Sequence, residues 1–494
     1  MPNIPAHPVI CIGAGPAGLT AAYELAKAGC PVIVLEADAK DVGGISRTAQ
    51  AGGYRFDIGG HRFFSKMPEI NALWQEILGD ELLVRGRKSR IYYGKKLYPY
   101  PLDLFKTITN LGIVESVLCG LSYFYARIFA HKNPTTFEQW VTNQFGARLY
   151  RIFFKTYTEK VWGMSCTQIS ADWAAQRIKG LSLLVAVKNA ALRALGLQGK
   201  NQVKTLIEQF HYPRKGPGQM WEAAAARITA LGGQVRMGCN ATDLSFDAAR
   251  GLWKLEYTDV ATGAVHKLET AHIISSAPLQ GLIAGIDAPA QVKAAAASLR
   301  YRDFLMVALT LKDEHAFDDN WIYIHDPHVK VGRIQNFKSW SEAMVPDSAM
   351  VCYGMEYFCF EGDDFWRQSD EALIAQASRE LETIGMGRAY NVQGGFVVRQ
   401  PKAYPVYDQS YQQHVGVIRR WLADFGVGLQ VVGRNGMHKY NNQDHSMMTA
   451  LLAARNILAG ELRYNVWQIN QDAEYHEEEA SAASGERFVP KAAG

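Results

Sequence analysis

The chain has 494 residues, of which 48% are hydrophobic and 20% charged, and its formal net charge is +4. This length exceeds one ordinary core and predicts two or three domains, or one nucleotide-binding domain with large insertions, with room to bury a sizeable ligand. The positive charge is too small to indicate nucleic-acid binding, and the composition is ordinary for a soluble globular protein.

The strongest local pattern is PVICIGAGPAGLTAAYELAKAGCPVIVLE, residues 8–36. An apolar run, three spaced glycines, an alanine-rich stretch and a second apolar run predict a strand, a tight turn, a helix and a strand that bind a dinucleotide. Gly13 permits the turn, Gly15 lets the backbone approach a pyrophosphate at the helix N-terminus, and Gly18 lets helix and strand pack closely. Glu36 ends the second strand, where it can accept hydrogen bonds from ribose hydroxyls. The pattern alone leaves FAD and NAD open.

Two glycine pairs follow, in VGGISRT, which carries Gly44 and Arg47, and in FDIGGHRFFS, which carries Gly60 and His61. Glycines let a backbone come close to a flat or charged ligand, so His61 either faces a ligand or is a buried histidine satisfied by a backbone carbonyl. This succession resembles the N-terminal signature of the flavin amine-oxidase superfamily, whose matching segments run along the pyrophosphate and ribityl chain of FAD. No second G-x-G-x-x-G is evident, and FAD is therefore the preferred cofactor.

Two later stretches, residues 110–132 and 182–200, are rich in apolar residues. Glu115 and Arg127 interrupt the first, and no stretch of the chain reaches the ~18 uninterrupted apolar residues that a membrane span needs. Each stretch is therefore either a core helix or a helix that rests on a bilayer or lines an apolar substrate channel.

The chain is expected to return to the cofactor twice more. HIISSAPLQGLI, residues 272–283, is typical of a strand that rejoins the nucleotide-binding sheet. Residues 429–460 predict a strand, a turn at Gly433 and a long amphipathic helix that begins near Asn442 or Asp444. The N-terminus of such a helix is expected to point at an anion, a contact worth about 0.3–1 kcal/mol.

Four separated blocks resemble UDP-galactopyranose mutase, a member of the same flavin superfamily, and they span most of the chain between residues 8 and 460. The blocks are FDIGGHRFFS (56–65), TTFEQWVTNQFG to FFKTYTEKVWGMS (135–165), FHYPRKGPGQMWE (210–222) and GRNGMHKYNNQDHSMM (433–448). The YTEKVWG stretch and the terminal block are the more specific, because FDIGG-like stretches recur across the wider superfamily.

The resemblance implies roles for individual side chains. His61 resembles the histidine that lies against the isoalloxazine ring beside N5, and Trp162 is similar to a tryptophan near the flavin and the sugar. Two arginines and three tyrosines resemble the residues that bind a diphosphate: Arg177, Arg333, Tyr323, Tyr404 and Tyr440. These residue types suit that ligand, since charge-assisted hydrogen bonds are worth about 1.5–3 kcal/mol each.

The expected fold is α/β, with a discontinuous Rossmann-like FAD-binding domain built on a parallel sheet and an inserted substrate domain. We assign the FAD-binding domain to residues 1–90, 206–300 and 426–465. The substrate domain has a helical part, 91–205, and an antiparallel-sheet part, 301–425. Residues 466–494 are charged, poor in apolar residues and expected to be disordered.

The resemblance implies an FAD-dependent mutase that interconverts pyranose and furanose forms of a nucleotide sugar through an adduct at N5 of reduced flavin, without net redox change. NAD(P)H is a candidate reductant. The alternative is an FAD-dependent oxidoreductase of amine oxidase, protoporphyrinogen oxidase or desaturase type, because the apolar helices leave room for a lipid-like substrate. A non-catalytic FAD-bound subunit is a third hypothesis, which the polar groups expected around the flavin disfavour.

The seven cysteines are odd in number and contain no C-x-x-C pair, which indicates a reducing compartment, no disulfide framework and no metal site. The N-terminus runs directly into an apolar strand and leaves no room for a cleavable leader, so a cytoplasmic protein is expected. The expected partner is a small molecule that contains a diphosphate. Peripheral membrane contact through the apolar helices and the oligomeric state are left open.

Overall fold

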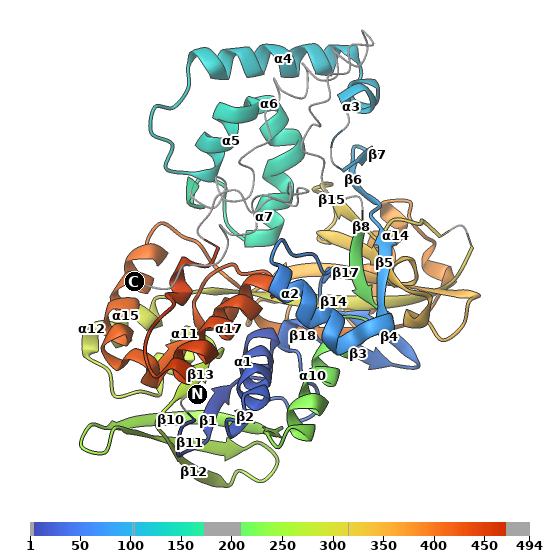
Figure 1. Cartoon of the computed structure of the whole chain (residues 1–494). Helices are drawn as coiled ribbons and strands as arrows, with labels where there is room; N and C mark the ends of the chain where they lie inside the picture. The colour runs from blue at the N-terminus through green and yellow to red at the C-terminus, as the bar shows by residue number, and fades with distance from the viewer. Residues whose placement is uncertain (1–3, 101, 103, 172–208, 315, 471–494) are drawn as a thin grey trace.

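The computed structural model describes residues 4–470 except 101, 103, 172–208 and 315. Figure 1 shows three parts: a nucleotide-binding region around β1 and α1, a large sheet beside it, and a helical part that stands apart at one end. The predicted α/β fold is confirmed, because a parallel sheet and a mostly antiparallel sheet both form with helices packed around them.

The nucleotide-binding region is built on a five-stranded sheet whose strands are all parallel. Its strands in spatial order are β19 (Leu429–Val431), β13 (Ile273–Ser275), β1 (Val9–Ile12), β2 (Val32–Leu35) and β9 (Gln234–Arg236). Every residue of β1 and β2 is buried, which is why both strands read as continuous apolar runs. The neighbours in this sheet lie far apart in the sequence, so the chain returns to it after each excursion.

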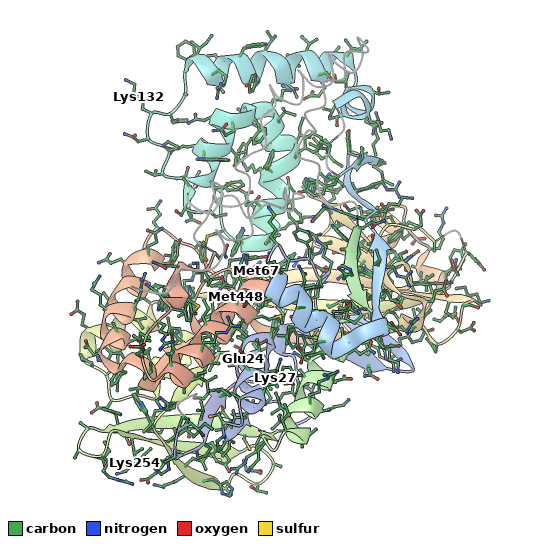
Figure 2. All side chains as sticks on the ribbon, viewed as in Figure 1. Glu24, Lys27, Met67, Lys132, Lys254 and Met448 are labelled. Carbon is green, nitrogen blue, oxygen red and sulfur yellow. The ribbon has the colours of Figure 1, made fainter. Side chains whose placement is uncertain are left out.

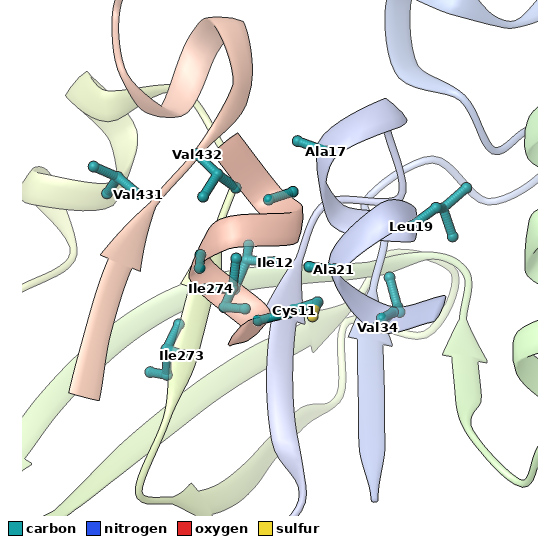
Figure 3. Packing of buried hydrophobic residues seen from close by; sticks show 14 of the residues in the cluster. Cys11, Ile12, Ala17, Leu19, Ala21, Val34, Ile273, Ile274, Val431 and Val432 are labelled. Atoms are coloured by element: carbon teal, nitrogen blue, oxygen red, sulfur yellow. The ribbon is translucent and has the colours of Figure 1, made fainter. Parts of the chain in front are cut away.

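Three helices cover this sheet. α1 (Pro16–Lys27) packs against both α10 (Gly218–Ala230) and α17 (Gln443–Ala459). Figure 3 shows the side chains of Cys11, Ala21 and Ile274 packed between the strands and α1. The segment before α2 (Pro68–Leu78) meets α17 near Met67 and Met448, which are buried in the same core (Figure 2).

The helix at 443–459 begins where the sequence predicts, but it is not amphipathic. Its buried residues occupy every face, because α1, α2 and the parallel sheet surround it. Val466–Gln468, placed with the tail in our prediction, forms a 3₁₀ turn that packs on this helix. The rest of the predicted tail, 471–494, lies outside the described residues.

The second large sheet has seven strands. In spatial order they are β18 (Val392–Pro405), β14 (Tyr301–Lys312), β17 (Met350–Cys359), β16 (Arg333–Asn336), β15 (Trp321–Ile324), β6 (Ser89–Tyr93) and β7 (Lys96–Pro99). All neighbours are antiparallel except β15 and β6, which are parallel. Residues 91–99, expected in the helical part, therefore belong to this sheet, because the backbone of β6 pairs with β15 and that of β7 pairs with β6.

The helical part consists of short helices in sequence order. They are α3 (Leu104–Leu111), α4 (Ile113–Ile128), α5 (Phe137–Phe145), α6 (Ala147–Tyr150), a π-helical turn (Arg151–Lys155) and α7 (Thr156–Trp162). Gly112, with a φ of +88°, separates α3 from α4. At Gly146 an added Cβ would lie 2.7 Å from the backbone nitrogen of Tyr123, so the turn before α6 presses against α4. Within the described ranges, no helix is both long and apolar enough to cross a bilayer.

Smaller elements complete the described chain. The remaining strands are β3 (Thr48–Ala51), β4 (Tyr54–Asp57), β5 (Leu82–Gly86), β8 (Gln209–Pro213), β10 (Cys239–Asp247), β11 (Leu252–Asp259) and β12 (Val265–Thr270). The remaining α-helices are α11 (Leu279–Ala284), α12 (Ala290–Ala297), α13 (Phe337–Trp340), α14 (Asp370–Thr383), α15 (Tyr411–Leu422) and α16 (Gly433–Gly436). All seven cysteines are buried and free.

Candidate functional site

The glycine turn after β1 has the geometry that its spacing predicts. Gly13 has a φ of +95°, which favours glycine. A Cβ added at Gly18 would lie 1.8 Å from the carbonyl oxygen of Gly13, so helix and turn touch through backbone alone. A Cβ added at Gly15 would meet nothing within 4 Å, so this glycine borders open space. The turn therefore has one glycine required by packing and one that leaves room beside the helix N-terminus.

The N-terminus of α1 is suited to an anion. Gly15 is its N-cap residue, no side chain caps the helix, Pro16 occupies the first turn, and that turn carries no acidic residue. The first backbone N–H groups of a helix lack partners within the helix and carry its positive dipole end. Together with the open space at Gly15, these features fit a pyrophosphate.

Glu36 lies at the end of β2, where it is held by backbone donors. Its Oε2 accepts a hydrogen bond of 2.6 Å from the N–H of Ala14, and its Oε1 accepts one of 2.9 Å from the N–H of Asp38. Burial raises the pKa of Glu36, and these two donors oppose that rise. Because a carboxylate can accept about four hydrogen bonds, acceptor positions remain for ribose hydroxyls.

Two distant segments meet the glycine turn. The N–H of Gly43 donates to the carbonyl of Ala14 at 2.8 Å, and a Cβ on Gly44 would lie 3.6 Å from the Cα of Gly15. From the terminal block, a Cβ on Gly433 would lie 2.9 Å from the Cβ of Ala17. The described structure thus brings both predicted segments to the dinucleotide turn.

Arg47 anchors the loop that contains Gly44. Its Nη1 donates to the carbonyl of Gly44 at 3.0 Å and also to the side chain of Gln400 on β18. Burial lowers the pKa of Arg47, while nearby acids such as Asp38 raise it. The guanidinium therefore connects this loop to the seven-stranded sheet, and its role toward a cofactor stays a prediction.

His61, Arg333 and Tyr404 come together at the turn formed by Gly59 and Gly60. A Cβ on Gly59 would lie 3.5 Å from His61 Nε2, 3.8 Å from Arg333 Nη2 and 3.8 Å from the Tyr404 hydroxyl. A Cβ on Gly60 would lie 3.7 Å from Arg333 Nη1. Three side chains from β16, β18 and the segment after β4 therefore share one small volume.

The imidazole of His61 is neutral. Its Nε2 lies 2.7 Å from the carbonyl oxygen of Ile58, so this nitrogen carries the proton and donates. Burial lowers the pKa of His61 to about 4, and the charges of Arg434 and Arg333 lower it further. A backbone carbonyl does accept a hydrogen bond from this histidine, as expected for a buried histidine with a structural role. The ring nevertheless also lies beside an arginine and a tyrosine.

Arg333 is paired with a carboxylate that the sequence did not reveal. Arg333 Nε and Nη2 lie 2.7 Å and 2.6 Å from Glu356 Oε2, and Glu356 on β17 is fully buried. Gln335 donates a further hydrogen bond of 2.5 Å to Glu356. Burial raises the pKa of Glu356 and the charge of Arg333 opposes the rise. One edge of the guanidinium is thus occupied, and its Nη1 faces Gly60.

An aromatic wall continues from Tyr404. Tyr404 and Tyr440 stack with ring centroids 5.7 Å apart, and Trp162 lies 6.4 Å from Tyr440. The guanidinium of Arg434 lies 4.9 Å from the Tyr440 ring and 5.3 Å from the Tyr404 ring. Arg434 Nε and Nη1 donate to the carbonyls of Asn441 and Ala403 at 2.9 and 3.3 Å, and no carboxylate of the described residues forms an ion pair with it. Sequence reasoning missed Arg434, although it lies in the terminal block.

Tyr323 reaches the same site through Tyr157. Their ring centroids are 5.3 Å apart, and Tyr157 stacks on His325 at 5.1 Å. Burial raises the pKa of Tyr157, and the nearby charge of Arg333 opposes this rise. On its other side Tyr323 contacts Tyr100 at 5.2 Å. The site therefore extends from Tyr440 to Tyr100, which follows β7 at the edge of the seven-stranded sheet.

Two further arginines adjoin this end of the site. Arg62 and Arg87 lie 5.0 Å and 5.4 Å from the ring of Trp321, which itself contacts Tyr323 at 6.3 Å. Burial lowers the pKa of Arg62 to about 10, and the like charge of Arg87 lowers it further. The arginine beside His61 in the sequence is the signal that could have identified this pair.

The YTEKVWG block holds its tryptophan in place mostly through backbone carbonyls. Lys160 Nζ donates to the carbonyls of Ile324, Asp326 and Val331, at 3.3, 2.6 and 3.1 Å. Burial lowers the pKa of this lysine to about 8. Arg302 donates to the carbonyls of Val161, Lys160 and Phe358, at 3.0, 3.3 and 2.6 Å. These contacts fix the end of α7, and with it Trp162, against β15, β16 and β17.

The remaining predicted residues have other surroundings. Asn442 is the N-cap residue of α17, and its N–H donates to His445 Nδ1 at 3.3 Å. Asp444 is buried in the first turn of that helix, and burial raises its pKa to about 7. Arg177 lies outside the described residues. Of the other predicted catalytic residues, His61, Arg333, Tyr404, Tyr440 and Trp162 belong to the cluster around Gly59 and Tyr404, and Tyr323 adjoins it through Tyr157.

This arrangement, a glycine turn on a parallel sheet with a polar and aromatic site beside it, is a Rossmann-like nucleotide-binding fold shared with the solved structures that the chain resembles. The profile of the NAD(P)-binding Rossmann-like domain matches residues 11–77. The solved structure of reduced UDP-galactopyranose mutase aligns with a TM-score of 0.78 and 21% identity, over 92% of this chain and 96% of that one. A protein assigned as protoporphyrinogen oxidase, from Exiguobacterium sp. 255-15, aligns with a TM-score of 0.70 and 15% identity, over 93% and 99% of the two chains.

A curated relative matches more closely in sequence but over less of the chain. Coproporphyrinogen III oxidase of Mycobacterium tuberculosis (strain ATCC 25618 / H37Rv) is 37% identical over 114 residues, which is 22% of this chain and 25% of the relative. The match thus spans a quarter of the curated protein. Fold similarity at these identities defines architecture, and the reaction has to be argued from the site.

Proposed function

We propose that the chain is an FAD-dependent enzyme of mutase type, which interconverts pyranose and furanose forms of a nucleotide sugar without net redox change. The observation that carries the proposal is the convergence of His61, Arg333 and Tyr404 at the Gly59–Gly60 turn. These three residues come from separate parts of the sequence, and the family resemblance implies flavin contact for His61 and diphosphate contact for Arg333 and Tyr404.

FAD fits the residues that are present. Gly15 and the uncapped N-terminus of α1 would hold the pyrophosphate, Glu36 the ribose, and the Gly44 loop would lie along the dinucleotide. When bound and reduced, the flavin supplies a nucleophilic ring nitrogen for attack on the sugar. His61, whose Nε2 is held by the carbonyl of Ile58, would contact the flavin and orient its other ring nitrogen as a hydrogen-bonding group.

The diphosphate would be held by arginine and tyrosine side chains. Arg333 offers Nη1 beside Gly60, and Arg434 offers a guanidinium that no described carboxylate pairs. The hydroxyl of Tyr404 lies next to Arg333, and Tyr440 stacks against it. Charge-assisted hydrogen bonds from such donors are worth about 1.5–3 kcal/mol each, which suits a doubly charged ligand. We also propose Arg177 for this group, on the resemblance alone.

One observation favours the oxidoreductase alternative. Glu356 neutralises Arg333, and a paired guanidinium attracts an anion less than a free one. An enzyme that removes hydride from an apolar substrate could use Arg333 only as the structural partner of Glu356, with no role in binding an anion. The two proposals differ in electron count: the mutase needs reduced flavin and returns it reduced, whereas the oxidoreductase reduces one flavin for each product.

The test compares the two redox states. Purified protein, with its flavin oxidised or reduced by dithionite, is incubated without oxygen with UDP-sugars in pyranose and furanose form, while ring form and flavin absorbance are followed. Ring interconversion only in the reduced state, with no change in flavin oxidation, supports the mutase proposal. Flavin reduction by an apolar substrate without any ring interconversion would favour the oxidoreductase.

Binding gives a second readout that does not depend on turnover. The affinity for UDP is measured by titration, with flavin fluorescence as the signal. It is expected to fall about tenfold or more in Tyr404→Phe, because one hydrogen bond to a charged group is lost without disturbing the ring stack. Arg250→Ala is the matched control, since Arg250 pairs with Glu269 on the exposed β10–β12 sheet. Equal affinity in wild type and Tyr404→Phe would remove this tyrosine from the diphosphate site.

A further inference from the structure

One face of α4 carries a concentration of exposed apolar side chains. Nineteen large hydrophobic residues are exposed in the described chain, and nine of them lie within residues 113–129. Ile113, Val117, Leu121, Phe124 and Ile128 are 80, 56, 62, 62 and 74% exposed, and their three- and four-residue spacing places them along one stripe of the helix. Scattered surface hydrophobics are normal, but a contiguous stripe of this size marks an interaction surface.

The opposite face of α4 is the one that packs. Cys119, Tyr123 and Ala126 are buried against α5 and α6. Figure 1 shows α4 lying across the outer end of the molecule, with α5 and α6 on its inner side. The side chains of the outer face are exposed, so among the described residues this helix presents its apolar stripe away from the elements that it packs against.

The charges around the stripe are basic. Glu115 is the one acidic residue among the described residues 104–137, and Arg148 neutralises it through two hydrogen bonds of 2.5 and 2.7 Å. Arg127 and Lys132 are exposed at the end of the helix, where Figure 2 shows Lys132 projecting at the edge of the molecule. At the other end, Lys96 donates to the carbonyl of Asn110, just before α4. An apolar stripe is thus bordered by positive charge at both ends.

We infer that α4 docks the protein on the surface of an anionic lipid bilayer, with the stripe in the interface and the basic residues at the headgroups. A helix with this division of side chains lies in the plane of the interface without crossing it. A second copy of the chain fits the surface less well, because a two-fold contact through α4 would bring the basic residues of both copies together. An anionic surface complements them.

Vesicle sedimentation of the full-length holoprotein tests the inference. Vesicles of phosphatidylcholine with about 30% phosphatidylglycerol are expected to bind the wild type, and pure phosphatidylcholine to bind it more weakly. The triple variant Val117→Gln/Leu121→Gln/Phe124→Gln should bind about a thousandfold more weakly, because each large side chain withdrawn from water contributes roughly tenfold. Glutamine is a good helix former, so the helix should persist.

Two comparisons distinguish insertion of the α4 stripe from nonspecific hydrophobic adsorption and from electrostatic attraction alone. The matched control Leu231→Gln/Val260→Gln/Val265→Gln replaces side chains that are 48, 56 and 56% exposed elsewhere, and it should bind as the wild type does. Arg127→Gln/Lys132→Gln should weaken binding to the anionic vesicles by about twenty-five-fold, at roughly fivefold for each charge, and leave binding to the neutral vesicles unchanged. Failure of the wild type to bind anionic vesicles, or equal loss in both triple variants, overturns the inference.

A fluorescent probe covers the case in which the triple variant does not fold. Leu121→Cys can be labelled selectively with an environment-sensitive dye, because all seven native thiols are buried. The dye should shift to the blue when anionic vesicles are added, and a dye on Val265→Cys should not. A dye on Leu121→Cys that is already shifted in buffer, and does not respond to vesicles, means that a second copy or residues 172–208 cover the face, and this overturns the inference.

Discussion

Two glycine-to-alanine substitutions in the turn after β1 are expected to separate the effect on cofactor binding from the effect on folding. Gly15 has a φ of −78°, which any residue adopts, and an added Cβ there meets nothing within 4 Å. Gly15→Ala should therefore fold, with a loss of about 1 kcal/mol or less because alanine is a poorer N-cap residue than glycine. The methyl group would, however, occupy the space proposed for the pyrophosphate. Losing one charge-assisted contact there weakens FAD binding by about ten- to a hundredfold.

Gly18→Ala is the opposite case. Its Cβ would lie 1.8 Å from the backbone oxygen of Gly13, so helix and turn must move apart. Overpacking against a backbone that cannot relax costs on the order of 3 kcal/mol or more. This variant should lose stability whether or not FAD is present, and Gly15→Ala should lose mainly the cofactor.

The assay measures FAD and stability separately. Flavin released by heat is quantified per protein, and urea titrations of cofactor-free protein give the free energy of unfolding. Gly281→Ala is the matched control, since its Cβ also meets nothing within 4 Å and it lies in α11, away from the turn. Wild-type affinity for FAD in Gly15→Ala, or equal destabilisation in Gly15→Ala and Gly18→Ala, would refute the reasoning.

Two further predictions concern buried charge. Glu356→Gln leaves the Arg333 guanidinium without its buried partner and should lower the free energy of unfolding by about 3–5 kcal/mol. The control Glu269→Gln breaks an exposed pair with Arg250 and should lower it by about 1 kcal/mol or less. Similar losses for the two variants in urea titrations would contradict the prediction for Glu356. Burial lowers the pKa of His325 to about 3, so its contribution to stability is complete above its unfolded pKa and declines as pH falls toward 3. Relative to His325→Gln, the wild type should therefore lose about 2 kcal/mol between pH 6.5 and pH 5, at roughly 1.4 kcal/mol per pH unit, and parallel pH profiles of the two proteins would disprove this.

The parts of the fold that sequence predicts are those set by local spacing. Gly13, Gly15 and Gly18 lie within six residues, and the turn geometry they require depends on little else. The helix at 443–459 was placed correctly at its start, because Asn442 is a typical N-cap residue. Its burial on all faces could not be predicted, since it depends on α1, α2 and a parallel sheet supplied by distant segments.

The site was predictable where a block resembled a known family, and not where two strands had to be paired. Glu356 lies opposite Arg333 in the register of β16 and β17, and nothing within either strand indicates that register. Arg434 and Tyr157 lay inside recognised blocks but went unassigned, because their contacts with Tyr404 and Tyr323 are made across the fold. The apolar character of 110–132 was evident in the sequence, whereas which of its faces stays exposed depends on α5 and α6.

The contacts of Lys160 and Arg302 that hold the end of α7 bear on how the site can vary between related sequences. Lys160 and Arg302 make their contacts to backbone carbonyls, and every residue presents a carbonyl whatever its side chain. Substitutions in the strands around Ile324, Val331 and Phe358 can therefore accumulate without loosening Trp162, provided that the strands keep their course. The contact should thus tolerate exchanges among apolar side chains of similar size at the buried Ile324 and Val331, and tolerate little change at the lysine and the arginine. A library of variants selected for retained fold should show that asymmetry directly.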